Sequence, residues 1–147
     1  MINYLLMTSE HVAQVAALEK ECFSMPWSEN VLIGELSNPL SLWVVAIDGD
    51  TVAGYVGSQS VMGEADMMNL AVLSSYRRQN IGKNLISELI KRLHEREVYS
   101  LTLEVRASNV PAIALYESRG YLQVGRRPNY YHKPKEDALI LRKEWSL

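Results

Sequence analysis

The sequence predicts an α/β fold with a mixed central sheet of about seven strands, flanked by about four helices. Two observations carry this prediction. Segments with strand-like and helix-like hydrophobic patterns follow one another in the order β-α-α-β-β-β-α-β-α-β-β, which is typical of a sheet covered by helices. The 147 residues contain no internal repeat, low-complexity tract or shift in composition, so residues 1–147 are interpreted as one domain.

The N-terminal part predicts one strand and two helices. Residues 2–7 (INYLLM) are interpreted as a short strand, and Thr8 or Ser9 can cap the helix that follows. Ser28 caps a shorter helix that runs to about Leu36 and ends at an Asn-Pro pair. The first helix has one apolar face, because four residues recur at helical spacing: Val12, Val15, Leu18 and Cys22.

The middle of the chain predicts three strands and a helix. Residues 42–47 (LWVVAI) and 51–61 (TVAGYVGSQSV) flank the turn Asp48-Gly49-Asp50 and are interpreted as a β-hairpin. Residues 65–73 (ADMMNLAVL) predict the next strand, and residues 81–96 predict an amphipathic helix. The apolar side of that helix is formed by Ile81, Leu85, Leu89 and Leu93, with Ile86 and Ile90 as the alternative pair.

The C-terminal part completes the sheet. Residues 100–106 (SLTLEVR) predict a strand. A helix begins with Asn109 and Pro111 and ends at Gly120. Residues 121–125 (YLQVG) and 137–143 (DALILRK) predict the last two strands.

The composition excludes several classes of protein. Fifteen Lys and Arg against seventeen Asp and Glu give a formal net charge of −2, far from the basic excess of general nucleic-acid binders. The single Cys22 cannot form an internal disulfide, which suits a reducing compartment. No leader-like segment and no membrane-length apolar run of about 18 residues is present in the sequence. We therefore expect a cytoplasmic protein that contacts neither a membrane nor nucleic acid directly.

The turn before the amphipathic helix predicts an anion site. Gly82 lets the backbone approach a ligand closely, and the helix N-terminus offers N–H groups that suit a pyrophosphate. A solvated basic turn explains the same residues equally well. The turn lacks the Lys-Ser/Thr ending of a nucleotide P-loop and the full dinucleotide pattern. The predicted cofactor-binding residues here are Arg77, Arg78, Gln79, Asn80, Ile81, Gly82 and Lys83.

This turn resembles the coenzyme A signature of the GNAT acetyltransferases, Arg/Gln-x-x-Gly-x-Gly/Ala. Arg77, Asn80 and Gly82 occupy the motif positions. Asn80 replaces the usual first glycine, and asparagine is the residue other than glycine that best tolerates positive φ. We therefore expect the turn to keep its shape.

Further segments are similar to one branch of that family, the bacterial ribosomal-protein-alanine N-acetyltransferases. Together they cover nearly the whole chain. The resemblance implies the GNAT fold, acetyl-CoA as cosubstrate, and the N-terminal alanine of the eighteenth small-subunit ribosomal protein as acceptor. The matching segments are MPWS (25–28), NLAV (69–72), LEVRASN (103–109), ALYESRGY (114–121) and NYY (129–131) followed by EDALIL.

The resemblance also assigns roles around the coenzyme. It implies that the backbone of Leu70, Ala71 and Val72 contacts the pantetheine arm, although their side chains have a core pattern. It implies a contact of Asn109 near the thioester, and Asn109 is equally suited to cap the helix that follows it.

Two residues are candidates for proton transfer. Glu104 lies on the polar side of its strand, a pattern that by itself favours a solvated carboxylate. Tyr116 has the pattern of a half-buried amphipathic tyrosine. The family resemblance implies instead that Glu104 accepts a proton from the amine and that Tyr116 donates one to the leaving thiolate. Cys22 is the alternative acyl-accepting nucleophile, but it shares the helical core pattern.

The acceptor peptide needs apolar walls, and Phe23, Trp27 and the Tyr130-Tyr131 loop are its predicted contacts. Trp27 equally fits a turn that joins two helices. Three scattered acidic residues either favour the binding of a basic protein tail or belong to a solvated face of this protein: Glu21, Glu29 and Glu35. The histidines show no metal-ligand spacing, so no metal is expected.

Two other functions remain open at this level. One is a relaxed N-terminal or lysine protein acetyltransferase. The other is a regulatory module that binds coenzyme A without turnover, against which the pair Glu104 and Tyr116 argues.

Overall fold

A computed structural model describes residues 1–132 and 134–147. The predicted order of elements is confirmed, and the described residues form seven strands, four α-helices and one short 3-10 helix. In chain order they are β1 (Asn3–Leu6), α1 (Val12–Cys22), α2 (Glu29–Leu36), β2 (Ser41–Asp48), β3 (Thr51–Val61), β4 (Glu64–Val72), the 3-10 helix η1 (Ser74–Tyr76), α3 (Ile81–Glu95), β5 (Ser100–Arg106), α4 (Val110–Ser118), β6 (Leu122–His132) and β7 (Lys135–Glu144).

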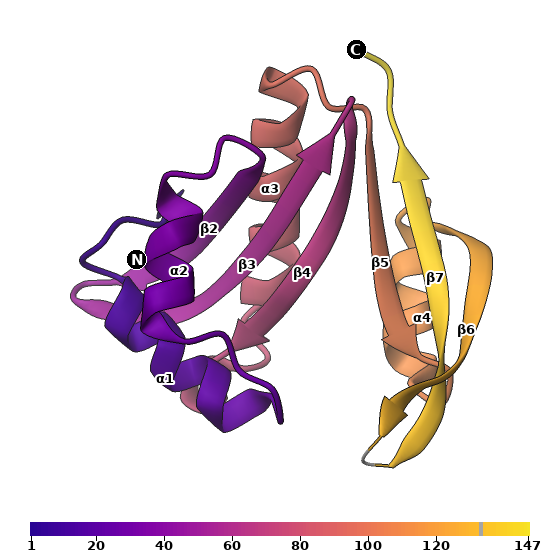
Figure 1. The fold of residues 1–147 in the computed structure, drawn as a ribbon, viewed down its shortest axis with the longest axis horizontal. Helices are drawn as coiled ribbons and strands as arrows, with labels where there is room; N and C mark the ends of the chain where they lie inside the picture. Colours follow the sequence, from indigo (N-terminus) through magenta and orange to yellow (C-terminus); the bar gives the residue numbers. More distant parts are fainter. Residues whose placement is uncertain (133) are drawn as a thin grey trace.

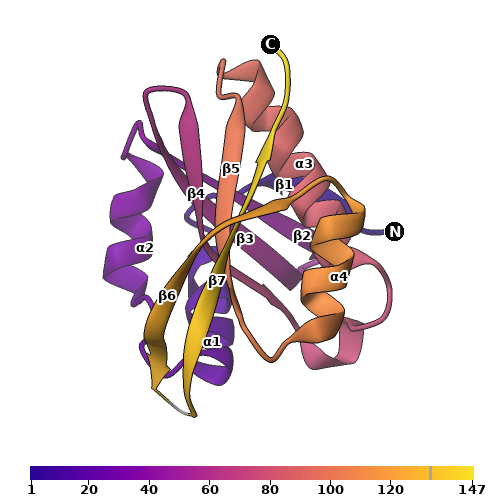
Figure 2. The same cartoon turned by 90° about the vertical axis from the view of Figure 1, so that its right-hand side faces the viewer.

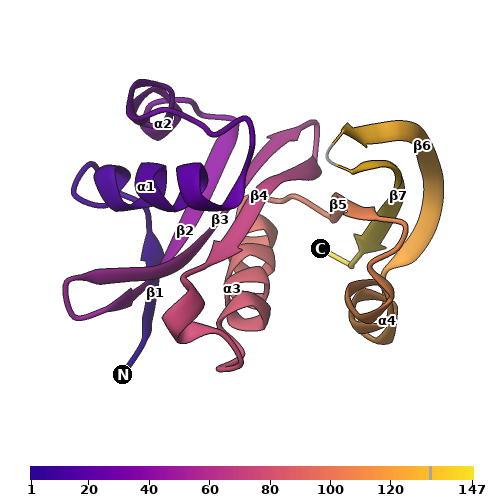
Figure 3. The same ribbon diagram turned by 90° about the horizontal axis from the view of Figure 1, so that it is seen from below.

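The strands form one mixed sheet in the order β1-β2-β3-β4-β5-β7-β6, in which β4 and β5 are parallel and the other neighbours are antiparallel. Helices α1 and α2 cover one face of the sheet, and α3 and α4 cover the other (Figures 1 and 3). Figure 2 shows the same two helix layers from the side of β6 and β7. This is the predicted α/β architecture.

The core is divided between the two faces. On the α3 face, the first of the two apolar sides predicted for this helix is the buried one. Its four residues are at most 2% exposed: Ile81, Leu85, Leu89 and Leu93. On the α1 face, Val15, Trp43 and Tyr55 are buried in a second cluster. Helices therefore cover β2 and β3 on both faces, which explains their nearly continuous apolar sequence.

The sheet opens between β4 and β5. Between the pairs Val56↔Leu70 and Ser58↔Met67, β4 carries one residue more than β3, which is a β-bulge. Within the described residues, β4 pairs with β5 only over residues 64–66 and 100–102. The two strands meet at one end of the sheet and separate towards the other (Figure 1). The split exposes a strand edge in the middle of the sheet.

Three local predictions were wrong. A turn precedes α1, so His11 occupies the cap position, and neither Thr8 nor Ser9 caps the helix. The Thr8 backbone N–H instead donates a hydrogen bond to His11 Nδ1, at 3.0 Å. Cys22 is exposed at the end of α1 rather than in the core. Tyr130 and Tyr131 lie in β6 rather than in a loop, because the β6–β7 hairpin extends to residue 132.

One acidic residue also differs from the expectation of a solvated face. Glu35 is only 8% exposed, since the α2 face that carries it packs on β2. It accepts hydrogen bonds from Ser41, Trp43, Gln59 and Asn38. Ser28 does cap α2 as predicted, by accepting from the Val31 N–H at 3.2 Å. None of the helices among the described residues combines the length and the apolar character of a membrane span.

Candidate functional site

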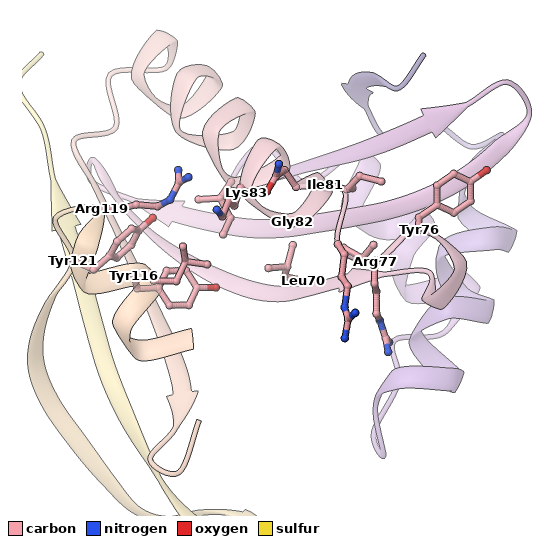
Figure 4. A pocket seen from close by; sticks show the side chains of 14 residues that line it. Leu70, Tyr76, Arg77, Ile81, Gly82, Lys83, Tyr116, Arg119 and Tyr121 are labelled. Atoms are coloured by element: carbon pink, nitrogen blue, oxygen red, sulfur yellow. The ribbon is translucent and has the colours of Figure 1, made fainter. Parts of the chain in front are cut away.

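A cavity of about 300 Å³ lies where the end of β4 faces the N-terminus of α3 and one side of α4. We call it the α3–α4 cavity. Figure 4 shows cations of the turn before α3 on one side and aromatic side chains of the α4 region on the other. Its lining residues are Leu70, Val72, Tyr76, Arg77, Arg78, Asn80, Ile81, Gly82, Lys83, Ile86, Leu115, Tyr116, Arg119 and Tyr121.

The turn before α3 has the geometry of an anion site. Asn80 adopts the left-handed conformation, with φ 61° and ψ 18°, so it holds the shape that a glycine would give. Its carbonyl accepts the first α3 hydrogen bond, from Asn84 N at 3.0 Å. The N–H groups that come before this bond have no intrahelical partner, and the helix dipole adds positive potential there. Anionic oxygens are therefore stabilised at this end of the cavity.

Gly82 leaves space at the same helix end. A Cβ built on Gly82 would meet only Val72 Cγ2, at 3.9 Å. A methyl group would therefore fit, whereas a long side chain would occupy the cavity that this residue lines.

The edge of β4 provides hydrogen-bonding groups along the cavity. Leu70 and Val72 line it, whereas Ala71 points to the α1 face and is 7% exposed. Beyond Asp66 the described part of β5 no longer pairs with β4. The backbone N–H and C=O groups on this edge can therefore pair with the amides of an extended ligand.

Tyr116 reaches into the cavity from α4. Its ring packs edge-on against Tyr121, with the centroids 5.2 Å apart and an interplanar angle of 67°. Its hydroxyl points across the cavity towards Leu70 (Figure 4). Burial raises the pKa of Tyr116 above that of a free phenol. The hydroxyl therefore remains protonated at neutral pH and can act as a proton donor.

A second pocket of about 480 Å³ lies on the α1 side of the sheet, where the segment after α1 faces the β6–β7 hairpin. We call it the hairpin pocket. The Arg106 guanidinium lies over the Tyr131 ring, with Cζ 4.2 Å from the centroid. The pocket is lined by Cys22, Phe23, Ser24, Met25, Asn69, Arg106, Tyr130, Tyr131 and His132.

Glu104 lies beside this pocket. Its neighbours Leu103 and Val105 pack in the buried cluster that Tyr116 also contacts. Since side chains alternate along a strand, Glu104 projects from the opposite face of β5. It forms an ion pair with Arg127, with Nε and Oε1 3.2 Å apart. A hydrogen bond to the Glu104 carboxylate raises the pKa of Tyr130 to about 12.

The structure does not bring every candidate residue together. Gln79 is exposed outside the α3–α4 cavity, and Asn109 caps α4 by accepting from Ala112 N at 3.3 Å. Trp27 packs edge-on against Trp43, at 5.3 Å between centroids, and does not line the hairpin pocket.

Sequence reasoning missed several lining residues. Leu115 lies on α4 and Arg119 is the C-cap residue four positions later, so the helical spacing around Tyr116 could have identified them. Ile86 likewise follows Gly82 by one helical turn. Tyr121 ends the family segment ALYESRGY, which could also have identified it, whereas Tyr76 had no signal apart from its aromatic character.

The comparison with known families agrees with this arrangement. Residues 12–121 match the model of the acetyltransferase (GNAT) family. The chain belongs to the GNAT acetyltransferase family. Within the GNAT family, the ribosomal protein bS18-alanine N-acetyltransferase of Salmonella typhimurium is 39% identical over 127 residues, which cover 84% of each chain.

Solved GNAT structures show the same fold. The crystal structure of the ribosomal-protein-S18-alanine N-acetyltransferase from Escherichia coli superposes with a TM-score of 0.89 and 34% identity, covering 100% of this chain and 96% of that one. A chain of the NatC complex bound to a Gag peptide and CoA has a TM-score of 0.83 at 24% identity, with 99% of both chains covered. The latter similarity concerns the fold alone.

Proposed function

We propose that the chain transfers the acetyl group of acetyl-CoA to the N-terminal alanine amine of ribosomal protein bS18, by direct transfer within a ternary complex. The observation that carries the proposal is that a buried tyrosine and a carboxylate lie on opposite faces of β5, and we assign to them the roles of proton donor and proton acceptor. Tyr116 reaches into the α3–α4 cavity, and Glu104 lies beside the hairpin pocket. The names of the relatives support the choice of acceptor.

In this proposal the α3–α4 cavity binds acetyl-CoA. The pyrophosphate lies at the α3 N-terminus, next to Arg77, Arg78 and Lys83. The pantetheine amides pair with the open edge of β4, which directs the thioester towards Tyr116. The peptide occupies the hairpin pocket and presents its amine at the split in the sheet.

The acceptor amine requires only a modest base. An N-terminal amine has a pKa of about 7.7–8.0, compared with about 10.4 for lysine. Glu104 accepts its proton through water as the nitrogen–carbon bond forms. The carbon–sulfur bond then breaks, and the Tyr116 hydroxyl gives its proton to the departing sulfur. Solvent restores both groups to their starting protonation.

Incubation with acetyl-CoA and matched peptides that begin with Ala, Ser or Met, or that carry an internal Lys, tests this function. We expect mass spectrometry to detect acetylation mainly on the peptide that begins with Ala. Equal acetylation of the internal-Lys peptide would favour a relaxed protein acetyltransferase. Binding of acetyl-CoA with no acetylated peptide would favour the regulatory module.

Gly82→Glu is expected to weaken acetyl-CoA binding strongly. The new carboxylate would fill the space next to Val72 and repel the phosphates at the helix end. Isothermal calorimetry measures the change in Kd. The matched variant Asn80→Gly keeps the left-handed position and should leave Kd unchanged or slightly lower. An unchanged Kd for Gly82→Glu would place the phosphates elsewhere.

Cys22→Ala is expected to retain kcat. Cys22 is exposed, but its thiol is partly desolvated, and this raises the pKa of the thiol. The negative charge of Glu21 raises this pKa further. The thiolate that a covalent route requires is therefore scarce. Intact-protein mass spectrometry after exposure to acetyl-CoA alone should show no acetylated enzyme. A kinetically competent acetyl-enzyme would overturn direct transfer.

A further inference from the structure

A buried carboxylate lies behind the wall of the hairpin pocket. Glu19 of α1 is 0% exposed. It accepts hydrogen bonds from the Tyr55 hydroxyl, from the Trp27 backbone N–H at 2.8 Å, and from Asn69 Nδ2, which lies 3.0 and 2.9 Å from its two oxygens. A buried carboxylate is costly unless such donors surround it. Glu19 therefore forms hydrogen bonds with three separate parts of the chain: the segment before α2, β3 and β4.

Two of these segments form walls of the hairpin pocket. Asn69 lies in the β4 bulge and lines the pocket directly. The Trp27 N–H lies at the end of the segment that begins with Cys22 and contributes Phe23 and Met25 to the lining of the pocket. Of the groups bonded to Glu19 among the described residues, only the Asn69 carboxamide belongs to a residue that lines the pocket.

The same contact orients the Asn69 carboxamide. Both hydrogen bonds of Nδ2 go to Glu19, and a flipped amide would direct Oδ1 at a carboxylate that can only accept. None of the hydrogen bonds among the described residues uses Asn69 Oδ1. The amide oxygen is thus the polar atom that Asn69 offers to a ligand.

Consecutive residues of β4 line the two cavities. Asn69 lines the hairpin pocket, and the next residue, Leu70, lines the α3–α4 cavity. We therefore expect that the amine of a peptide in the hairpin pocket passes close to Asn69 when it reacts with a thioester in the α3–α4 cavity. A neutral amide oxygen can accept an N–H of this amine and favours the ammonium form less than a carboxylate would.

We infer that Asn69 Oδ1 accepts a hydrogen bond from the α-amine of the acceptor peptide and that Glu19 is the positioning residue that holds it. The inference rests on the proposed function. The neutral amine uses its lone pair for attack, one N–H for the water bound to Glu104, and the other N–H for Asn69. Both residues thus act on peptide binding and not on acetyl-CoA.

Asn69→Ala is expected to raise the KM for an Ala-starting peptide by about twofold to tenfold, the range of one lost hydrogen bond. The Kd for acetyl-CoA should not change. Glu19→Gln is expected to raise the same KM, because one amide oxygen cannot accept from every donor around it. Since Glu19 acts through Asn69, the double variant should have nearly the KM of Asn69→Ala alone.

Glu35→Gln is the matched control. Glu35 is also a buried carboxylate that accepts several side-chain hydrogen bonds, but none of its partners lines the hairpin pocket. It should lower the thermal midpoint as Glu19→Gln does and leave the peptide KM unchanged. If Glu19→Gln fails to fold, Asn69→Ala decides alone, because it leaves Glu19 its other donors.

The outcomes separate this inference from the proposed function. An unchanged KM in Asn69→Ala, additive effects in the double variant, or an equal KM change in Glu35→Gln would overturn the inference while the wild type still acetylates the peptide. If the wild type acetylates no peptide that begins with Ala, the proposed function and the inference both fall.

Discussion

Tyr116→Phe is expected to lower kcat by about 10²- to 10⁴-fold, the usual cost of losing a catalytic acid. The substitution removes only the hydroxyl, and the ring keeps its edge-on contact with Tyr121. The fold and the Kd for acetyl-CoA should therefore survive. Burial raises the pKa of Tyr116, so the donor is present through neutral pH in the wild type. Raising the pH should not rescue the variant, because phenylalanine has no proton to give.

Tyr121→Phe is the matched control for this prediction. It removes the hydroxyl of a second tyrosine that lines the same cavity, and this hydroxyl is itself buried without a hydrogen-bond partner among the described residues. Losing an unsatisfied buried group does not break an interaction. Steady-state kinetics should therefore give a kcat close to the wild type. Equal losses in Tyr116→Phe and Tyr121→Phe would contradict a proton-donor role for Tyr116.

Glu104→Gln is expected to lower turnover by about 10²- to 10⁴-fold at low pH and by less at high pH. Below about pH 7.7–8.0 an N-terminal amine is mostly charged and requires a base. Above that range most of the amine is already neutral, so part of the activity should return. The measurement is the pH profile of kcat/KM, compared with those of the wild type and Tyr116→Phe.

Glu64→Gln serves as control for the loss of charge. Glu64 is another carboxylate of the sheet that pairs with an arginine, Arg142 at 2.8 Å, but it lies opposite Ser100, where β4 still pairs with β5. Its pH profile should match the wild type. Losses of only a few-fold that are independent of pH in both Glu104→Gln and Tyr116→Phe would mean that neither residue carries a proton.

Elements with a local signal were predictable from the sequence. The α3 stripe from Ile81 to Leu93 and the Ser28 cap of α2 follow from spacing and capping chemistry within a few residues. The left-handed conformation of Asn80 follows in the same way from the preferences of that residue. The family resemblance added the β4 backbone contacts of residues 70–72, the contact of Asn109 and the proton-transfer roles of Glu104 and Tyr116.

Features that depend on distant partners were not predictable. Glu19 lies 50 positions from Asn69 and 36 from Tyr55, so its burial leaves no local pattern. The acidic character of Glu35 suggested solvent, yet its partners on β2 and β3 bury it. The length of β6 was underestimated because a polar, solvent-exposed hairpin lacks the apolar alternation of a core strand.

By itself, the sequence determined the order of the elements, and it restricted the core face of α3 to two apolar stripes, because both depend on spacing along the chain. Burial in the tertiary structure selected the stripe from Ile81 to Leu93. Only the tertiary structure decided where the sheet splits. The extra residue of the β4 bulge can be recognised only when β4 is paired with β3, so the sequence of β4 alone does not reveal it. The tertiary structure also placed Tyr116 of α4 and Glu104 of β5 on opposite faces of the sheet, each beside one of the two cavities. Contacts between segments far apart in sequence, rather than any local preference, assembled the candidate site.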